Sequence, residues 1–221
     1  MEGKNLFEFC TKAENQIDIA KTIETFNFID KSISINEVIT EDTAKRVVNE
    51  IRFWNSLETI DNFEQKEPIV IYIDSSGGDL NATYSIIAAI ELSTVPVYTV
   101  NMGKAYSGGF FILISGTKRF AVPYCSYLFH EGSVCSGDDA HKFLQHADFY
   151  RHQLSQLKEI TLNNTTISEE LYNKHKKDDW WFGNQTAIKY NVIDEEIIDF
   201  NDFRKELIIK IEDGKEEEDY E

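Results

Sequence analysis

Ser107 is the residue whose type and position first suggest chemistry. It lies in GKAYSGGFFILISG, 103–116, between a glycine-containing turn and an apolar run. This pattern predicts that a helix begins at Ser107, where unpaired backbone N–H groups and the helix dipole favour negative charge. Its hydroxyl could attack a carbonyl carbon, and the resulting oxyanion would be stabilised nearby. The alternative is that Ser107 is only the N-cap of the helix, since serine often has that role.

Two further residue types are needed to activate such a serine. A serine hydroxyl is a weak nucleophile until a nearby base removes its proton, and histidine is suited to this at neutral pH. His130 ends the segment SYLFH, a predicted strand that could hold the ring rigidly. A carboxylate must then orient the imidazole, and HKKDDWWF offers Asp178 and Asp179. The alternatives are a structural histidine and a solvated acidic pair.

A pair of glycines, Gly77 and Gly78, follows the clearest buried strand, IVIYID at 69–74. Such glycines let backbone N–H groups approach an oxyanion or a phosphate closely, although the phosphate-loop pattern with its lysine is missing. A tight turn is the plainer interpretation. Asp79 is expected to cap the next helix, whose predicted apolar face includes Leu80, Tyr84, Ile87 and Ile90.

Alternating strands and helices are expected to position these residues. Hydrophobic patterning predicts strands at 26–35, 69–74, 95–101, 118–123 and 126–130, and helices at about 41–54, from 80, from 107 and at about 138–161. A polar connector ends at Pro68. This alternation indicates an α/β domain with a mainly parallel sheet.

The long helix at 138–161 has an apolar seam at alternating steps of four and three residues: Phe143, Ala147, Tyr150, Leu154 and Leu157. Such a seam needs either a partner surface or the protein's own core. After it, Thr166 and Glu169 form a possible capping box for the short helix SEELYNKH.

Composition excludes several classes of function. A net charge of −17 disfavours nucleic acid and anionic membrane surfaces as partners. The three cysteines, Cys10, Cys125 and Cys135, form no CxxC pair and are expected to be reduced thiols. No two histidines have the i, i+4 spacing of helical metal ligands, so we expect neither a metal nor a cofactor. The N-terminus lacks a signal-peptide pattern, and a cytoplasmic protein is expected.

The order of these segments carries a family resemblance, which extends from about Phe26 to Asp194. The motifs SSGGD, GKAYSGG, KRFAVP and SYLFHEG occur in this order. They resemble the SPGG-type turn, the GxAxSMGA-type serine segment, the KRxALPN-type strand and the MIHQP-type histidine segment of the ClpP family, the proteolytic subunit of the Clp protease. The resemblance implies the ClpP/crotonase-like fold of repeated β-β-α units with a protruding handle helix, here at about 138–161.

The resemblance also assigns roles to individual residues. It implies Ser107 as nucleophile, His130 as general base, and the N–H groups of Gly78 and Gly108 as oxyanion donors. The family's catalytic aspartate lies in a DxFMSAEEAxEYGLID-type segment, and counting back from Asp194 places it on Asp179 rather than Asp178. Asn191 stands where glycine is usual, a change that a left-handed helix cap tolerates.

Other departures from the family pattern concern the substrate. Ser76 replaces the usual proline, Tyr106 replaces a small residue beside the nucleophile, and Gly109 and Phe110 replace the usual pair after it. The core chemistry survives these changes, but the substrate pocket is expected to differ. The chain is therefore expected to be a divergent or phage-type member.

Three functions remain as hypotheses. The first is a serine endopeptidase that cleaves peptides or unfolded proteins inside a homo-oligomeric ring, with a Clp-type ATPase unfoldase as its partner. The second is a catalytically silent structural ring subunit, and the third is a crotonase-type acyl-CoA enzyme. The expected organisation is an N-terminal arm at 1–25, a peptidase domain at 26–200, and an acidic tail at 201–221.

Overall fold

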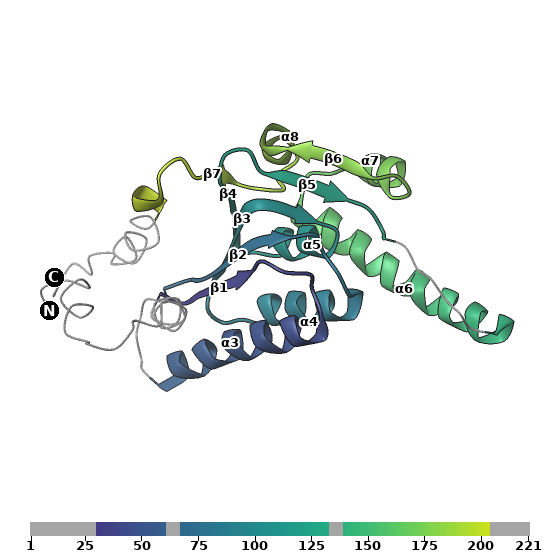
Figure 1. Ribbon diagram of the computed structural model, residues 1–221, viewed down its shortest axis with the longest axis horizontal. Helices are drawn as coiled ribbons and strands as arrows, with labels where there is room; N and C mark the ends of the chain where they lie inside the picture. The colour runs from purple at the N-terminus through teal and green to yellow at the C-terminus, as the bar shows by residue number, and fades with distance from the viewer. Residues whose placement is uncertain (1–29, 61–66, 133–138, 204–221) are drawn as a thin grey trace, which may run out of the picture.

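A parallel sheet lies at the centre of the computed structural model (Figure 1), which describes residues 30–60, 67–132 and 139–203. Five strands lie side by side in the sheet in the same order as in the chain, and each adjacent pair is parallel. They are β1 (Ser32–Ile35), β2 (Ile69–Ser75), β3 (Val97–Tyr106), β4 (Lys118–Ala121) and β7 (Glu195–Glu196). The predicted α/β class with a mainly parallel sheet is confirmed.

Two more strands extend the sheet on one side of β3. Beyond the part that pairs with β4, β3 pairs in parallel with β5 (Ser126–Phe129), and β6 (Trp180–Gly183) then pairs antiparallel with β5. Because β3 changes its neighbour along its length, the C-terminal end of β3 lies beside the C-terminal end of β5.

Three helices pack on one face of the sheet: α3 (Glu41–Ile60), α4 (Leu80–Glu91) and α5 (Gly108–Ile114). α3 and α4 lie side by side below the sheet in the view of Figure 1. The alternate residues of the strands that point to this side are buried isoleucines, such as Ile33 and Ile35 on β1 and Ile71 and Ile73 on β2. This face forms the main hydrophobic core.

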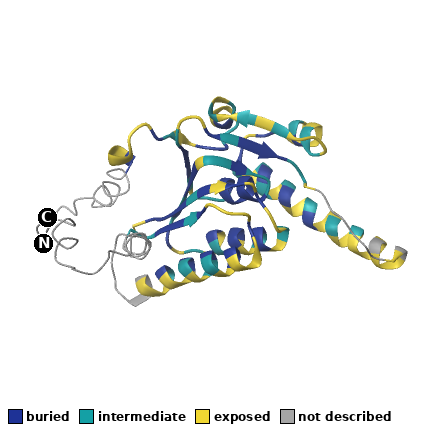
Figure 2. Cartoon of the chain, viewed as in Figure 1, coloured by how far each residue is buried: buried dark blue, intermediate teal, exposed yellow. Residues whose placement is uncertain are grey.

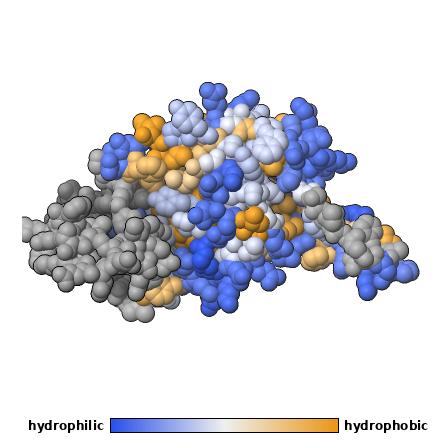
Figure 3. All heavy atoms as spheres, in the orientation of Figure 1, coloured by the Kyte–Doolittle hydropathy of each residue, from blue (hydrophilic) through white to orange (hydrophobic). Residues whose placement is uncertain are grey.

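The opposite face of the sheet is covered in part by the segment that follows β7. A second cluster joins Val70, Val100 and Phe120 of the sheet to Ile197 and Phe203 of this segment. Figure 3 shows hydrophobic side chains gathered near β7 on a face that is otherwise mostly hydrophilic. Phe203 is 6% exposed, so the packed part of the chain continues into the predicted tail at 201–221.

Helix α6 (Ala140–Asn164) projects away from the body of the protein, as Figures 1 and 2 show. Its C-terminal half packs against the core and leads to α7 (Glu169–His175) and α8 (Asn184–Lys189). Its N-terminal half exposes large apolar side chains: Leu144 and Phe149 are each 60% exposed.

The predicted seam on α6 therefore divides into two parts. Leu157 is 2% exposed and Leu154 packs against the same core, so the protein's own core, and not a partner surface, covers these two residues. Ala147 and Tyr150 are half-buried, and the side chain of Phe143 lies outside what the structure describes.

Several predicted boundaries also change. The helix predicted at 41–54 continues to Ile60, and the strand predicted at 95–101 continues to Tyr106. The short helix is capped by Ser168, whose hydroxyl accepts from the Leu171 N–H at 3.2 Å, so the predicted cap at Thr166 is wrong. Asp79 does cap α4, and Asn191 has the expected left-handed backbone with φ 53°. The predicted arm at 1–25 lies outside the described residues.

Arg119 on β4 joins three segments of the fold. Its backbone N–H donates to Oδ2 of Asp194 at 2.8 Å, and its guanidinium donates to Oδ1 at 2.6 Å and Oδ2 at 3.2 Å. The guanidinium also donates to the carbonyl of Asn164 at the end of α6. The Arg119 side chain is 9% exposed and that of Asp194 is 33% exposed. This bidentate pair ties α6 and the segment before β7 to the central sheet.

Arg119→Ala should lower the free energy of unfolding by about 3 kcal/mol, because it leaves the partly buried Asp194 carboxylate without its positively charged partner. Urea denaturation followed by circular dichroism measures the loss. The control is Arg151→Ala, since Arg151 pairs with Asp148 on α6 but its side chain is 73% exposed, and an exposed pair contributes less than about 1 kcal/mol. Equal losses in the two variants would contradict the structural role of Arg119.

Candidate active site

Ser107 lies at the sharp turn between β3 and α5. Its backbone has φ 52° and ψ −119°, a conformation that non-glycine residues rarely adopt and that costs about 1–3 kcal/mol. Within the described chain its side chain makes no capping hydrogen bond to α5, so the hydroxyl does not act as an N-cap. The Ser107 N–H donates to the carbonyl of Leu128 at 2.9 Å, which holds the turn against β5.

The glycine turn after β2 lies directly against Ser107. Gly77 has φ 87°, which favours glycine. A Cβ atom placed on Gly77 would come within 2.7 Å of the Ser107 Cβ and 2.9 Å of the Gly108 nitrogen. The absence of a side chain at Gly77 is therefore what lets the two turns approach each other.

The N–H groups of Gly78 and Gly108 lie on these two adjacent turns. The Ile39 N–H donates to the Gly77 carbonyl at 2.9 Å, and the Asp79 N–H donates to the Ile39 carbonyl at 2.8 Å. Because successive N–H groups of an extended segment point to opposite sides, that of Gly78 points away from Ile39. Gly108 is the first residue of α5, so its N–H has no acceptor within the helix. Its Cβ position is 3.6 Å from the Gly78 nitrogen.

His130 and Asp179 are brought together by the pairing of β5 with β6. Phe129 lies opposite Trp180 in this antiparallel pair, so the residue after the first and the residue before the second also face each other. His130 Nδ1 lies 3.1 Å from Asp179 Oδ1. A carboxylate accepting from Nδ1 leaves Nε2 of the neutral ring as a proton acceptor. The strand register gives this position to Asp179 and not to Asp178.

Strand β6 was not predicted from the sequence, although it positions the aspartate. Its signal was the alternation within WWFG: Trp180 and Phe182 pack inward, while Trp181 is 54% exposed. Phe182 stacks on Tyr127 with ring centroids 5.2 Å apart and an interplanar angle of 6°. Trp180 stacks on His175 at 4.4 Å. These contacts fix β6 on the core.

Glu131 is a second residue that sequence reasoning missed. Its backbone N–H donates to the Lys176 carbonyl at 3.2 Å, and its carboxylate accepts from the Tyr172 hydroxyl at 3.0 Å. Burial raises the pKa of Tyr172, and the Glu131 carboxylate adds to the effect, so the phenol stays protonated as a donor. These bonds anchor the residue after His130 to the end of α7.

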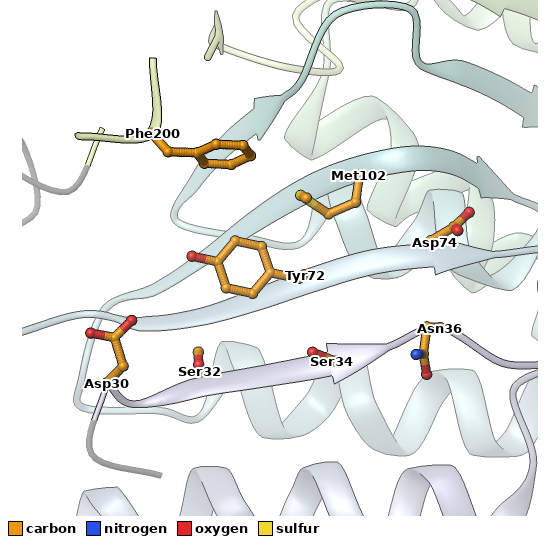
Figure 4. A pocket seen from close by; sticks show the side chains of 8 residues that line it. All are labelled: Asp30, Ser32, Ser34, Asn36, Tyr72, Asp74, Met102 and Phe200. Atoms are coloured by element: carbon orange, nitrogen blue, oxygen red, sulfur yellow. The ribbon is translucent and has the colours of Figure 1, made fainter. Parts of the chain in front are cut away.

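The described residues also include a pocket of about 470 Å³, shown in Figure 4. It lies on the sheet face opposite α3 and α4, since its β1 residues alternate with buried Ile33 and Ile35. None of the three predicted catalytic residues lines it. The lining residues are Asp30, Ser32, Ser34, Asn36, Tyr72, Asp74, Met102 and Phe200.

Neither a metal cluster nor a membrane-spanning helix is found in the described part of the chain. There, no three His, Cys, Asp or Glu side chains are grouped so as to hold a metal ion. No described helix is both long enough and apolar enough to cross a membrane.

Comparisons with known proteins agree on one family. The family model described as Clp protease matches residues 13–199. The ATP-dependent Clp protease proteolytic subunit 2 of Treponema pallidum is 28% identical over 165 residues, which are 74% of this chain and 80% of that protein. The subunit 2 of Nocardia farcinica is 26% identical over 196 residues, 88% of this chain and 94% of that protein. The subunit 2 of Borreliella burgdorferi is 30% identical over 172 residues, 75% and 81% of the two chains.

A solved structure has the same fold. The structure of a ClpP1 mutant from Listeria monocytogenes aligns with a TM-score of 0.69 over 81% of this chain and 98% of that chain, at 23% identity. The resemblance inferred from the sequence is confirmed, and the low identities are those of a divergent member, while a phage-type origin stays a prediction. The chain belongs to the Clp protease family.

Proposed function

We propose that this protein is a serine endopeptidase that cleaves peptides or unfolded proteins through Ser107, His130 and Asp179. The observation that carries the proposal is the 3.1 Å contact between His130 Nδ1 and Asp179 Oδ1. This contact lies at the end of β5, the strand to which the backbone of Ser107 is paired. Family membership supports the same reaction.

The mechanism follows from the roles of the three residues. Asp179 holds the His130 tautomer with the proton on Nδ1, so that Nε2 accepts the proton of the Ser107 hydroxyl as Oγ attacks the peptide carbonyl. The oxyanion of the tetrahedral intermediate accepts hydrogen bonds from the N–H groups of Gly78 and Gly108. His130 then protonates the leaving amine. In the second half His130 takes a proton from water, the water oxygen attacks the acyl-enzyme carbonyl, and Ser107 Oγ leaves with the proton that His130 returns to it.

The alternatives have less support. A catalytically silent ring subunit would be expected to have lost a member of the triad, whereas all three residues are retained here. A crotonase-type acyl-CoA enzyme would share the fold and the glycine donors but would not need a paired histidine and aspartate beside a serine.

The proposal includes partners and a location. The names of the relatives contain the words ATP-dependent, and this chain lacks a phosphate-loop lysine after its glycine pair. A separate Clp-type ATPase would therefore supply unfolded polypeptide, in the cytoplasm. Homo-oligomeric rings are supported by the projecting half of α6, because Leu144 and Phe149 expose large apolar surfaces there.

Ser107→Ala should abolish labelling by a fluorophosphonate probe and reduce peptide hydrolysis to a residual rate, because the hydroxyl forms the covalent bond. Mass spectrometry of the labelled protein maps the modified residue. Ser115→Ala is the matched control, since Ser115 lies at the other end of α5 and donates to the Phe111 carbonyl at 2.8 Å. Labelling that persists in Ser107→Ala would exclude Ser107 as the nucleophile.

Asp179→Asn should lower peptide turnover by about 10⁴-fold, because an amide donor would favour the wrong tautomer of His130. Asp178→Asn is the control and should change turnover by less than about threefold, the effect of an ordinary surface substitution. Steady-state hydrolysis of one fluorogenic peptide compares the two. Similar small losses in both would mean that no aspartate completes a triad.

Phe149→Asp should reduce the mass of the native assembly, because it places a charge on the exposed apolar half of α6. Size-exclusion chromatography with light scattering measures the mass. Leu92→Asp is the control, since Leu92 is 81% exposed but lies at the end of α4. A monomeric wild-type protein would refute assembly through α6. Leu154 is unsuitable for this test because it packs on the core.

A further inference from the structure

His130 and Asp179 each lie one residue beyond the last pair of the β5–β6 ladder, in which Phe129 faces Trp180. The His130 side chain is 25% exposed and that of Asp179 is 56% exposed. A pair this exposed contributes little to holding its own geometry, because water screens the charges and competes for the hydrogen bond. The 3.1 Å contact between His130 Nδ1 and Asp179 Oδ1 therefore depends on how the neighbouring chain is held.

Tyr172 of α7 contacts the residues on both sides of His130. Its ring meets that of Phe129 edge to face, with centroids 5.2 Å apart and an interplanar angle of 65°. Its hydroxyl donates to the Glu131 carboxylate at 3.0 Å. Tyr172 is 0% exposed, and a side chain in a close-packed core has little room to move. One buried side chain thus holds the chain immediately before and immediately after His130.

The end of the same helix holds the backbone that carries the aspartate. The Lys176 carbonyl accepts from the Glu131 N–H at 3.2 Å. Two residues later, the Asp178 N–H donates to the His175 carbonyl at 3.1 Å. The chain then turns directly from α7 into β6, as Figure 1 shows. α7 therefore supports both members of the pair, His130 through Glu131 and Asp179 through its own last turn.

The Tyr172 hydroxyl does more than fill space in the core, since a phenylalanine ring would make the same contact with Phe129. A buried hydroxyl needs an acceptor, and here the acceptor is the half-buried carboxylate of Glu131. Hydrogen bonds to a charged acceptor are stronger than those between neutral groups. The next residue, Gly132, has φ 82° and no side chain, so Glu131 supplies the side-chain tie at this end of His130.

We propose that Tyr172 and Glu131 are positioning residues that hold the His130 imidazole within hydrogen-bond distance of Asp179. This inference rests on the proposed function. Neither side chain takes part in the proton transfers of that mechanism. Their hydrogen bond restrains the chain after His130, where the β5–β6 ladder has already ended. Without this bond the imidazole could move away from the carboxylate, and a displacement of about 1 Å can lower turnover about 10²-fold.

Tyr172→Phe tests the inference, because it removes the hydroxyl and keeps the ring that packs on Phe129. It should lower kcat for a fluorogenic peptide about 10-fold, a smaller loss than a full 1 Å displacement causes. KM should change by less than about twofold, since the buried Tyr172 makes no contact with substrate. The rate of fluorophosphonate labelling should fall in parallel, because His130 activates Ser107 in both reactions.

Two variants of Glu131 separate the hydrogen bond from the charge. The amide oxygen of glutamine can still accept from the Tyr172 hydroxyl, so Glu131→Gln should keep kcat within about threefold of the wild type. Glu131→Ala should lose as much as Tyr172→Phe. The double variant should lose no more than either single variant, because both changes remove the same bond. Glu131→Ala also serves as the test if Tyr172→Phe does not fold.

Tyr127→Phe is the matched control. Tyr127 lies on β5, is also 0% exposed, and its hydroxyl donates to Asn184 Oδ1 at 3.0 Å. The variant removes a buried hydrogen bond of the same length as that between Tyr172 and Glu131, but not one beside His130. It should therefore lower the urea midpoint as Tyr172→Phe does, while kcat stays at the wild-type value.

The possible outcomes separate the inference from the proposed function. Equal losses of kcat in Tyr127→Phe and Tyr172→Phe would overturn the inference, because they would reveal a general loosening of the core. A Glu131→Gln variant as slow as Glu131→Ala would overturn it too, since the charge would then matter and not the bond. Unchanged kcat in Tyr172→Phe and Glu131→Ala would remove the positioning role and leave the proposed function intact. A wild-type protein that neither reacts with the probe nor cleaves any peptide would refute the proposed function itself, and the positioning role with it.

Discussion

The buried side chain of Asn101 holds the point at which β3 changes its neighbour from β4 to β5, and the candidate site depends on this change. Its amide donates to the Ser126 carbonyl at 3.2 Å and accepts from the Gly103 N–H at 3.0 Å. The side chain thus satisfies backbone groups that the ladder leaves unpaired where the partner strand changes. Because β5 then runs beside the end of β3, Ser107 lies against the strand that carries His130.

The unfavourable backbone conformation at Ser107 is balanced by the core on which α5 packs. Every residue of α5, 108–114, is buried, and most of them are large and apolar. Burial of such side chains contributes about 1.5–3 kcal/mol each, so it offsets the cost of one strained turn. The same packing fixes the direction of α5 and with it that of the Gly108 N–H, which the proposed mechanism uses as an oxyanion donor.

The two faces of the β5–β6 pair have different roles: one packs on the core, and the other carries the residues of the candidate site. On one face, Trp180 and Phe182 pack with the rings of Tyr127 and Phe129 in the core. The other face is partly open to solvent and carries His130, Asp179 and the exposed Trp181. The inner face fixes the register, and the register decides which outer residues meet. A substitution at an inner-face residue could therefore shift the register of β5 and β6 and separate His130 from Asp179 without contacting either residue.

The sequence by itself determined the order of strands and helices, the glycine turn, the serine turn and the strand that ends at His130, because these depend on local patterning and on the conformational needs of glycine. Through the resemblance to a family, counting back from Asp194 also selected Asp179 rather than Asp178. Only the tertiary structure decided that Leu154 and Leu157 of α6 are covered by the protein's own core, since periodicity defines an apolar face but not what covers it. The strand β6 arises from its pairing with β5, whose partner residues are about 50 to 60 positions apart in the chain, and no local pattern records this pairing.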